Sequence, residues 1–279
     1  MSRKQIEIAV LGVLIIGVIL YAGTGIVYAG ALSSSSESTL NTVVSHQNAL
    51  NTSFNEIDSE VAALGGSGTF DPQQAVGLVD RSVTSSQAAA SMINRDDSSL
   101  ASVQGQLDSS RWLTLVGHST VDREWARVGH ARNALAAARM IAADQVLDGH
   151  FWHTLYTALG ELDTLNNQSG SGDFTSAKTT LAAMQTDVGQ AVRQSTAPGL
   201  PPDLHSLMLD LETFVSDFGK QLDAQIAGDD AAVAQYQASL DADRNKLGTY
   251  NVDKIGSDID AFYRPLIERF NSEIAAATS

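Results

Sequence analysis

The chain has 279 residues, of which 43% are hydrophobic and 6% aromatic, and it carries a formal net charge of −15. Such a charge repels nucleic-acid phosphates and anionic lipid headgroups, so we expect neither as a binding partner. The chain contains no cysteine, which excludes disulfides, thiolate-bound metal sites and a cysteine nucleophile. Few aromatic and many alanine residues favour closely packed helices over a β-sandwich.

The N-terminus has the pattern of a membrane segment. Arg3 and Lys4 precede an apolar run over residues 8–29, and about 20 apolar residues in a helix cross the hydrocarbon layer of a bilayer. Because basic residues mark the cytoplasmic side of such spans, we expect the rest of the chain outside the cytoplasm. Residues 1–32 are therefore predicted to form a cytoplasmic stub and a transmembrane signal anchor, and residues 33–38 a Ser-rich tether. A signal peptide cleaved near the end of the apolar run is the alternative.

An acidic residue, Glu7, stands near the head of this apolar run. In this respect the N-terminus resembles type IV pilins, which carry an acidic residue early in a hydrophobic helix, and the resemblance implies a surface-filament subunit. Residues 1–5 do not supply the small residue and processing site that those chains need. A pilin-like subunit is therefore an alternative interpretation only.

Apolar residues recur at alternating steps of three and four between residues 40 and 64. This is the heptad spacing of a helix that packs along one seam, and the Gly-rich residues 65–68 end the helix. The seam either packs on the chain's own domain or binds a partner, which is a second copy or another protein. The candidate partner-binding residues are Leu40, Val43, Leu50, Phe54, Ile57 and Val61.

The next helix is expected to open at Asp71-Pro72, where a capping residue precedes a proline of the first turn. Because the sequence beyond residue 94 is polar and Ser-rich, we expect a bend or a break near residues 96–97. The predicted inward residues are Val76, Val79, Val83 and Met92.

In the following region, an alanine-rich stretch and helix-breaking residues predict where helices and loops lie. The Ala-rich residues 133–143 indicate a tightly packed helix, which we expect to be interrupted at residues 148–149. Helical spacing resumes over residues 151–165, and residues 166–172 read as a loop.

Three further helices are delimited by caps and breaks. Asp173 is predicted to cap a helix that runs to about residue 195, and the Pro-rich residues 197–202 separate it from the next helix, which starts at Asp203. Gly228-Asp229 ends that helix and caps its successor, and a last helix follows residue 251. The predicted inward faces of the two longer helices are Leu204, Leu207, Leu211, Phe214, Phe218, Leu222 and Ile226, and Ile255, Ile259, Phe262, Leu266, Phe270 and Ile274.

No run of alternating β-branched residues indicates a sheet. The predicted fold class is therefore all-α, with one N-terminal transmembrane helix followed by an extracytoplasmic antiparallel helical bundle. Residues 39–168 would form a helical region with the heptad helix and a His/Trp-rich segment, and residues 169–279 a region of helical hairpins. Similar motifs at residues 210–214 and 258–262 indicate repeated hairpins, although chance similarity between amphipathic helices explains them almost as well.

Residues 112–165 hold all three tryptophans and four of the six histidines. His150 and His153 share a helix face, His118 and His130 precede them, and imidazoles with carboxylates bind Zn, Fe or Cu. Because no Glu-x-x-His or His-Glu-x-x-His motif occurs, we expect surface or packing histidines and no metal. A metal- or haem-binding bundle is the alternative, with these four histidines as candidate ligands.

A lattice of charges lies at helical spacing in the same region, formed by Asp122, Arg123, Glu124 and Arg127. Such Arg–carboxylate pairs either cover a solvated helix face or hold a small anion or a partner.

The sequence contains no nucleophile elbow, phosphate-binding Gly-rich loop, Rossmann fingerprint or EF-hand loop. We therefore expect no catalysis and no cofactor. The expected function is that of a membrane-anchored extracytoplasmic module for binding, scaffolding or sensory accessory work. The layout resembles the ectodomains of bacterial sensory receptors, but without a second span or an output domain any signal would pass through another protein.

Overall fold

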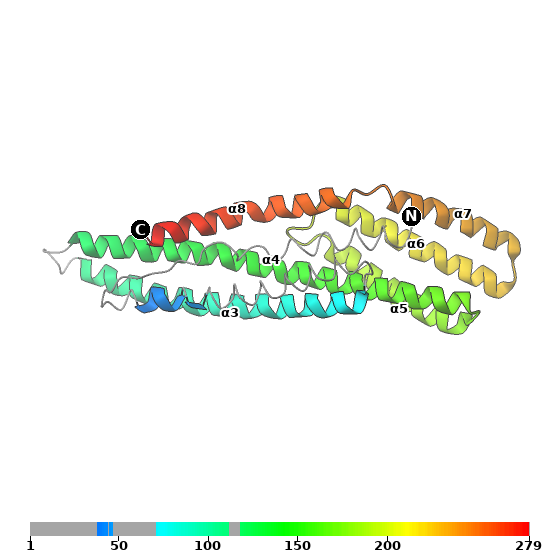
Figure 1. The fold of residues 1–279 in the computed structure, drawn as a ribbon, viewed down its shortest axis with the longest axis horizontal. Helices are drawn as coiled ribbons and strands as arrows, with labels where there is room; N and C mark the ends of the chain where they lie inside the picture. The colour runs from blue at the N-terminus through cyan, green and yellow to red at the C-terminus, as the bar shows by residue number, and fades with distance from the viewer. Residues whose placement is uncertain (1–37, 44, 47–70, 112–117, 279) are drawn as a thin grey trace. The chain divides into compact units, whose positions relative to one another are not determined.

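A computed structural model describes residues 38–43, 45–46, 71–111 and 118–278. Within these ranges the chain is helical and contains no strand, which confirms the predicted all-α class. Among the described helices, none combines the length and the apolarity that a bilayer crossing requires. The apolar run over residues 8–29 lies outside the described ranges. The long helices are α3 (Pro72–Arg111), α4 (His118–Gly170), α5 (Phe174–Gln194), α6 (Pro202–Ala227), α7 (Asp230–Leu247) and α8 (Val252–Thr278) (Figure 1).

The chain divides into two compact units. The described residues of unit 1 are 71–83 and 147–260, and those of unit 2 are 38–43, 45–46, 84–111, 118–146 and 261–278. Each of α3, α4 and α8 contributes one part of its length to each unit, whereas α5, α6 and α7 belong wholly to unit 1.

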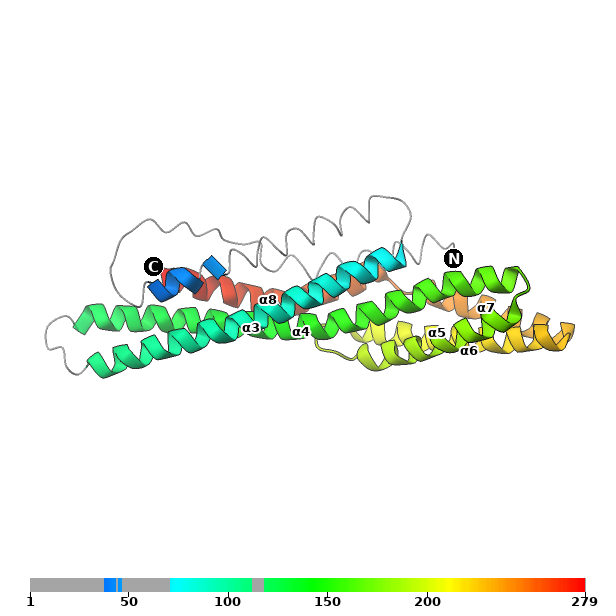
Figure 2. The same ribbon diagram turned by 90° about the horizontal axis from the view of Figure 1, so that it is seen from below.

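In unit 1, α5, α6 and α7 follow one another as antiparallel neighbours (Figures 1 and 2). The predicted caps are confirmed: the carboxylates of Asp173 and Asp229 accept the backbone N–H groups of Ser176 and Ala232 at 3.2 and 3.0 Å. Between α6 and α7, Gly228 takes a left-handed conformation with φ of 67°, which favours glycine because it has no Cβ. Local sequence signals therefore place these helix ends.

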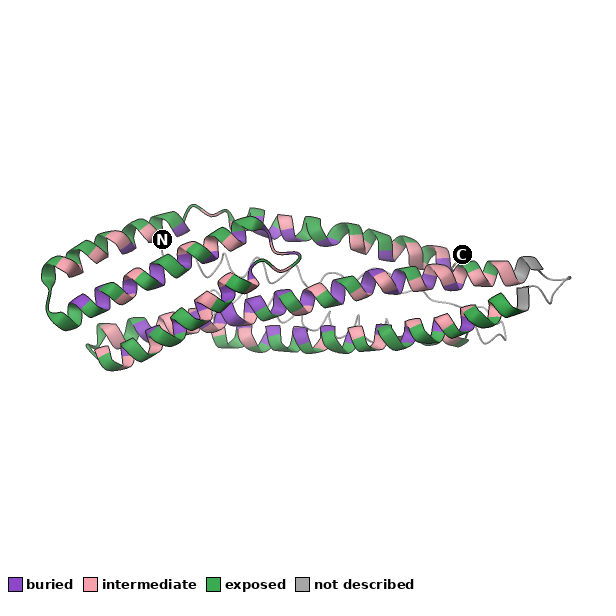
Figure 3. Cartoon of the chain, turned by 180° about the vertical axis from the view of Figure 1, so that it is seen from behind, coloured by how far each residue is buried: buried purple, intermediate pink, exposed green. Residues whose placement is uncertain are grey.

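The buried residues recur along one side of α5 and α6, at the spacing of amphipathic helices (Figure 3). Most predicted inward residues are buried or half-buried, but two are exposed: Ile226 by 48% and Phe262 by 40%. Ile226 lies in the last turn of α6. In α8 the neighbouring Tyr263 takes the buried position and packs edge-on against the Phe262 ring, with 5.1 Å between centroids.

No break occurs near residues 96–97, because α3 is one continuous helix of 40 residues. Asp96 is 4% exposed and accepts a hydrogen bond from His46 Nδ1 at 2.9 Å. Asp97 accepts hydrogen bonds from arginines of α4. Since both carboxylates find partners outside their own helix, they do not compete for its backbone N–H groups.

The interruption expected at residues 148–149 is also absent, because α4 runs unbroken for 53 residues. Gly149 is buried where α3 approaches α4, and a Cβ at this position would lie 2.3 Å from Val83 Cγ2. The glycine allows a close helix approach and does not break the helix.

The expected loop over residues 166–172 is shorter than predicted, because α4 extends to Gly170. The side chain of Gln168 accepts a hydrogen bond from the Thr180 hydroxyl of α5 at 2.8 Å. This contact between neighbouring helices stabilises a stretch of polar residues whose local propensity favours a turn.

The prediction of close packing in residues 133–143 is confirmed. Ala134, Ala137, Ala138 and Ala142 of α4 are each at most 2% exposed. Small side chains at these positions let neighbouring backbones approach, as expected for an alanine-rich helix face.

The net charge is distributed unevenly. The described residues of unit 1 contain nineteen acidic and seven basic residues, a formal net charge of −12, whereas those of unit 2 contain eight of each. All eight basic residues of unit 2 are arginines. Among the described residues, the acidity is therefore concentrated in unit 1, and those of unit 2 are arginine-rich with no formal net charge.

Candidate functional site in unit 2

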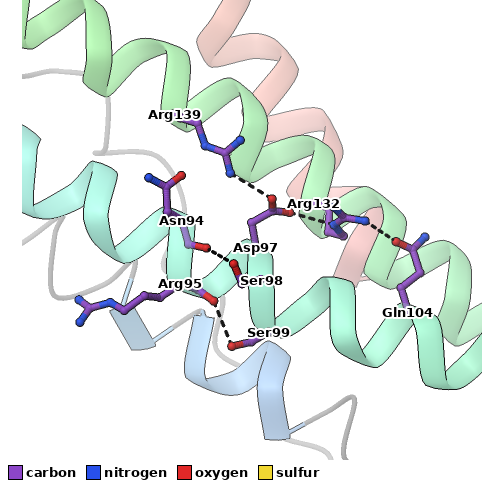
Figure 4. Close-up of polar contacts among 8 residues, drawn as sticks. All are labelled: Asn94, Arg95, Asp97, Ser98, Ser99, Gln104, Arg132 and Arg139. Atoms are coloured by element: carbon purple, nitrogen blue, oxygen red, sulfur yellow. Dashed lines mark hydrogen bonds and ion pairs between the residues drawn. The ribbon is translucent and has the colours of Figure 1, made fainter.

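A polar network that joins α3 and α4 in unit 2 centres on Asp97 of α3 (Figure 4). Its Oδ1 accepts Arg132 Nε at 2.8 Å and its Oδ2 accepts Arg139 Nη2 at 3.1 Å. Arg132 also donates from Nη1 to Gln104 Oε1 at 2.8 Å. Because Arg132 and Arg139 are seven residues apart on α4, they project from the same face of that helix, and one carboxylate joins both to α3.

The electrostatics of this network favour an ionised Asp97. Burial opposes ionisation, but the hydrogen bonds and charges of Arg132 and Arg139 outweigh it and hold the pKa of Asp97 below its ordinary value. The three side chains are between 23% and 40% exposed. One buried donor, Arg139 Nε, has no hydrogen-bond partner. Two guanidinium groups share one carboxylate, so the network carries one surplus positive charge.

The arrangement can cross-link helices, and its guanidinium groups could meet a small anion at their exposed edges. The donor without a partner, Arg139 Nε, is buried, so a ligand cannot reach it without moving the side chain. The polar neighbours Ser98 and Ser99 donate to backbone carbonyls of their own helix (Figure 4). A structural cross-link is therefore the role that the geometry supports.

The predicted charge lattice around Glu124 and Arg127 is not a fully solvated helix face. Arg127 is 18% exposed and donates from Nη1 to Glu124 Oε1 at 3.0 Å and from Nε to the carbonyl oxygen of Ala277 at 2.9 Å. Arg123, by contrast, is 62% exposed and lies 4.0 Å from Glu124. Arg127 thus caps the C-terminal end of α8, where helix carbonyls lack intrahelical partners.

The candidate histidines occupy separate settings. His130 donates from Nδ1 to Glu273 Oε2 at 2.7 Å in unit 2, and this hydrogen bond lowers the pKa of Glu273. His153 donates to Asp80 Oδ1 at 2.7 Å in unit 1, and His150 is exposed. His118 begins α4, but its side chain lies outside the description.

When the Nδ1–H group of a neutral imidazole donates to a carboxylate, Nε2 keeps a free lone pair. Metal-ligating histidines are commonly oriented in this way. Searching the described residues finds no group of three or more His, Asp or Glu side chains that could hold a metal ion. His130 and His153 have different carboxylate partners and do not form a shared ligand set.

A Ser–His pair, which the sequence did not suggest, lies at the break between α5 and α6. Ser195 is 1% exposed, its hydroxyl donates to the Val192 carbonyl at 2.8 Å, and its oxygen lies 2.7 Å from His205 Nδ1. Because the serine proton is used by the carbonyl, the imidazole must donate here and not accept. The pair therefore holds the break closed and lacks the direction of a nucleophile–base pair.

The seam of residues 40–64 is described only at its start. Leu40 is half-buried and Val43 is 4% exposed within the single chain. Leu50, Phe54, Ile57 and Val61 lie outside the described residues, so their partner-binding role stays a prediction.

The sequence alone did not indicate that Asp97 and its arginine partners form a unit. The available signal was an acidic pair within one predicted helix and two arginines with a spacing of seven in another.

Comparisons with protein-family models, with curated proteins and with solved structures find no match to this chain.

Proposed function

We propose that this protein is a non-catalytic binding or scaffold module, held outside the cytoplasm by an N-terminal transmembrane helix, with its hairpins forming an antiparallel helical bundle. The proposal depends on the contrast between the apolar N-terminal segment and the rest of the chain. Arg3, Lys4 and an apolar run over residues 8–29 precede a chain whose described helices include no candidate membrane span.

The polar contacts support the non-catalytic part of the proposal. The side chains with catalytic chemistry that the sequence singled out are engaged between helices: His130 with Glu273 and His153 with Asp80. Arg127 likewise binds Glu124 and the end of α8. Residues that hold helices together in this way make a rigid surface for a partner.

Single-cysteine labelling tests the topology cleanly, because the chain has no native cysteine. We expect a membrane-impermeant maleimide to label Ala238→Cys, an exposed position of α7, in cells whose cytoplasmic membrane is intact. The matched Ser2→Cys variant should be labelled only after lysis. Labelling of Ser2→Cys before lysis, or protection of Ala238→Cys, would contradict the proposed topology.

Metal analysis distinguishes this proposal from the metal- or haem-binding alternative. We expect the purified full chain to take up neither Zn²⁺ nor haem in stoichiometric amounts. Stoichiometric uptake that is lost in His130→Ala or His153→Ala would replace the non-catalytic module with a metal- or haem-binding function.

A further inference from the structure

The interface between α4 and α5 in unit 1 contains a stripe of polar residues. On α4 these residues are Thr154, Glu161 and Gln168, at intervals of seven, which places them on one face of the helix. Gln190 donates to the Thr154 hydroxyl at 3.5 Å and Thr180 donates to Gln168 Oε1 at 2.8 Å. The first and last positions of the stripe therefore have hydrogen-bond partners across the interface.

The middle position is different. Glu161 is half-buried, but its Oε2 atom is buried and has no hydrogen-bond partner among the described residues. The charge that acts on it is that of Asp187 on α5. Leu165 of α4 and Met184 and Val188 of α5, close to the pair in sequence, are almost fully buried. A carboxylate oxygen with no donor, opposed by a second carboxylate, is costly to keep ionised in such a place.

The charged groups around Glu161 are few. From α5 the opposing group is Asp187. On the side of α3, Pro72 approaches the preceding residue of α4, since a Cβ at Gly160 would lie 3.6 Å from Pro72 Cβ. Asp163 stands on α4 itself, and no basic side chain of the described residues is among the causes that shift the pKa of Glu161.

We propose that Glu161 and Asp187 form a proton-operated latch between α4 and α5, which closes when Glu161 binds a proton and loosens when both carboxyls are ionised. The proton comes from solvent and converts the buried oxygen into an O–H donor, which can bond to the Asp187 carboxylate. The flanking hydrogen bonds of Thr154 and Gln168 set the register of the two helices in the closed state.

The direction of the pH dependence follows from the titration. Burial, and then the charge of Asp187, raises the pKa of Glu161 to about 7 from its ordinary value of 4.5. A carboxyl whose pKa is raised by folding contributes stability fully below pH 4.5, and that contribution is lost as the pH rises to about 7. The latch is therefore closed in mildly acidic surroundings and loose above neutrality.

Spin-label distances across the hairpin test the latch in the full chain. Cysteines placed at the exposed Asn166 of α4 and Ala183 of α5 are labelled with nitroxides, and the distance distribution is measured from pH 5.5 to 8.5. We expect a narrow distribution at pH 5.5 that broadens towards longer distances with a midpoint near pH 7.

Variants separate the latch from general effects of pH. Glu161→Gln, an uncharged isostere of the protonated acid, should keep the narrow distribution at every pH, and Asp187→Asn should move the midpoint to lower pH. Glu212→Gln, at an exposed carboxyl of α6, should leave the response unchanged. A wild-type distribution that is the same at both ends of the range, or a Glu161→Gln variant that still responds, would overturn the proposal.

Discussion

Replacing Gly149 by alanine is expected to lower the free energy of unfolding by about 1–3 kcal/mol, the usual range for overpacking a core. The new Cβ would lie 2.3 Å from Val83 Cγ2, and valine in a helix has essentially one rotamer, so it cannot turn away. The higher helix propensity of alanine offsets about 1 kcal/mol of this loss. Urea unfolding of the full chain, followed by circular dichroism, measures the change.

A matched glycine provides the control. Gly77 lies within α3 with nothing within 4 Å of its would-be Cβ, so Gly77→Ala should raise stability by about 0.5–1 kcal/mol. In a Val83→Ala background, Gly149→Ala should become neutral or stabilising, because the clashing methyl group is gone. If Gly149→Ala is stabilising in the native background, the helices do not approach as closely as the structure places them.

Asp97→Asn is expected to lower the free energy of unfolding by about 1–2 kcal/mol. The substitution keeps the shape of the side chain but removes the charge that two arginines share, and charge-assisted hydrogen bonds are worth about twice a neutral one. Partial exposure of Arg132 and Arg139 screens the loss and limits its size. Thermal or urea unfolding of the full chain measures it.

The pH dependence of this difference has a definite sign. Because the pKa of Asp97 is lowered by folding, its contribution is present above the ordinary value of 3.8 and disappears as the pH falls further. The gap between wild type and Asp97→Asn should therefore be constant from pH 5 to 8 and close below about pH 3.8. Asp241→Asn, at an exposed pair with Arg244, should change stability by less than about 0.5 kcal/mol. Equal effects at the two positions would exclude a special role for Asp97.

Local signals in the sequence were sufficient for the starts of α5 and α7 and for the end of α6. Asp173, Gly228 and Asp229 act on neighbouring backbone groups, so their effect is encoded within a few residues. The wrong predictions concern residues whose structure depends on distant parts of the chain. Asp96, Asp97 and Gln168 have hydrogen-bond partners outside their own helix, and Gly149 lies where α3 approaches α4. No local sequence pattern reports these neighbours.

The candidate site was harder to predict for the same reason. Asp97 and Arg132 are 35 positions apart and His130 and Glu273 are 143 apart, so their pairing depends on which helices become neighbours. The sequence singled out the arginine- and histidine-rich part of α4. It did not indicate that these side chains would join helices, because amphipathic spacing identifies a buried face but not its partner.

The segregation of basic residue types has a practical consequence for chemical modification. Apart from Lys4, every lysine of the chain lies in unit 1: Lys178, Lys220, Lys246 and Lys254. Arginine does not react with amine-directed reagents at neutral pH, so biotinylation, fluorophore coupling or resin attachment through these lysines would decorate unit 1 and spare unit 2. Endoproteinase Lys-C would likewise leave α4 intact while cutting in α5, α6, α7 and α8.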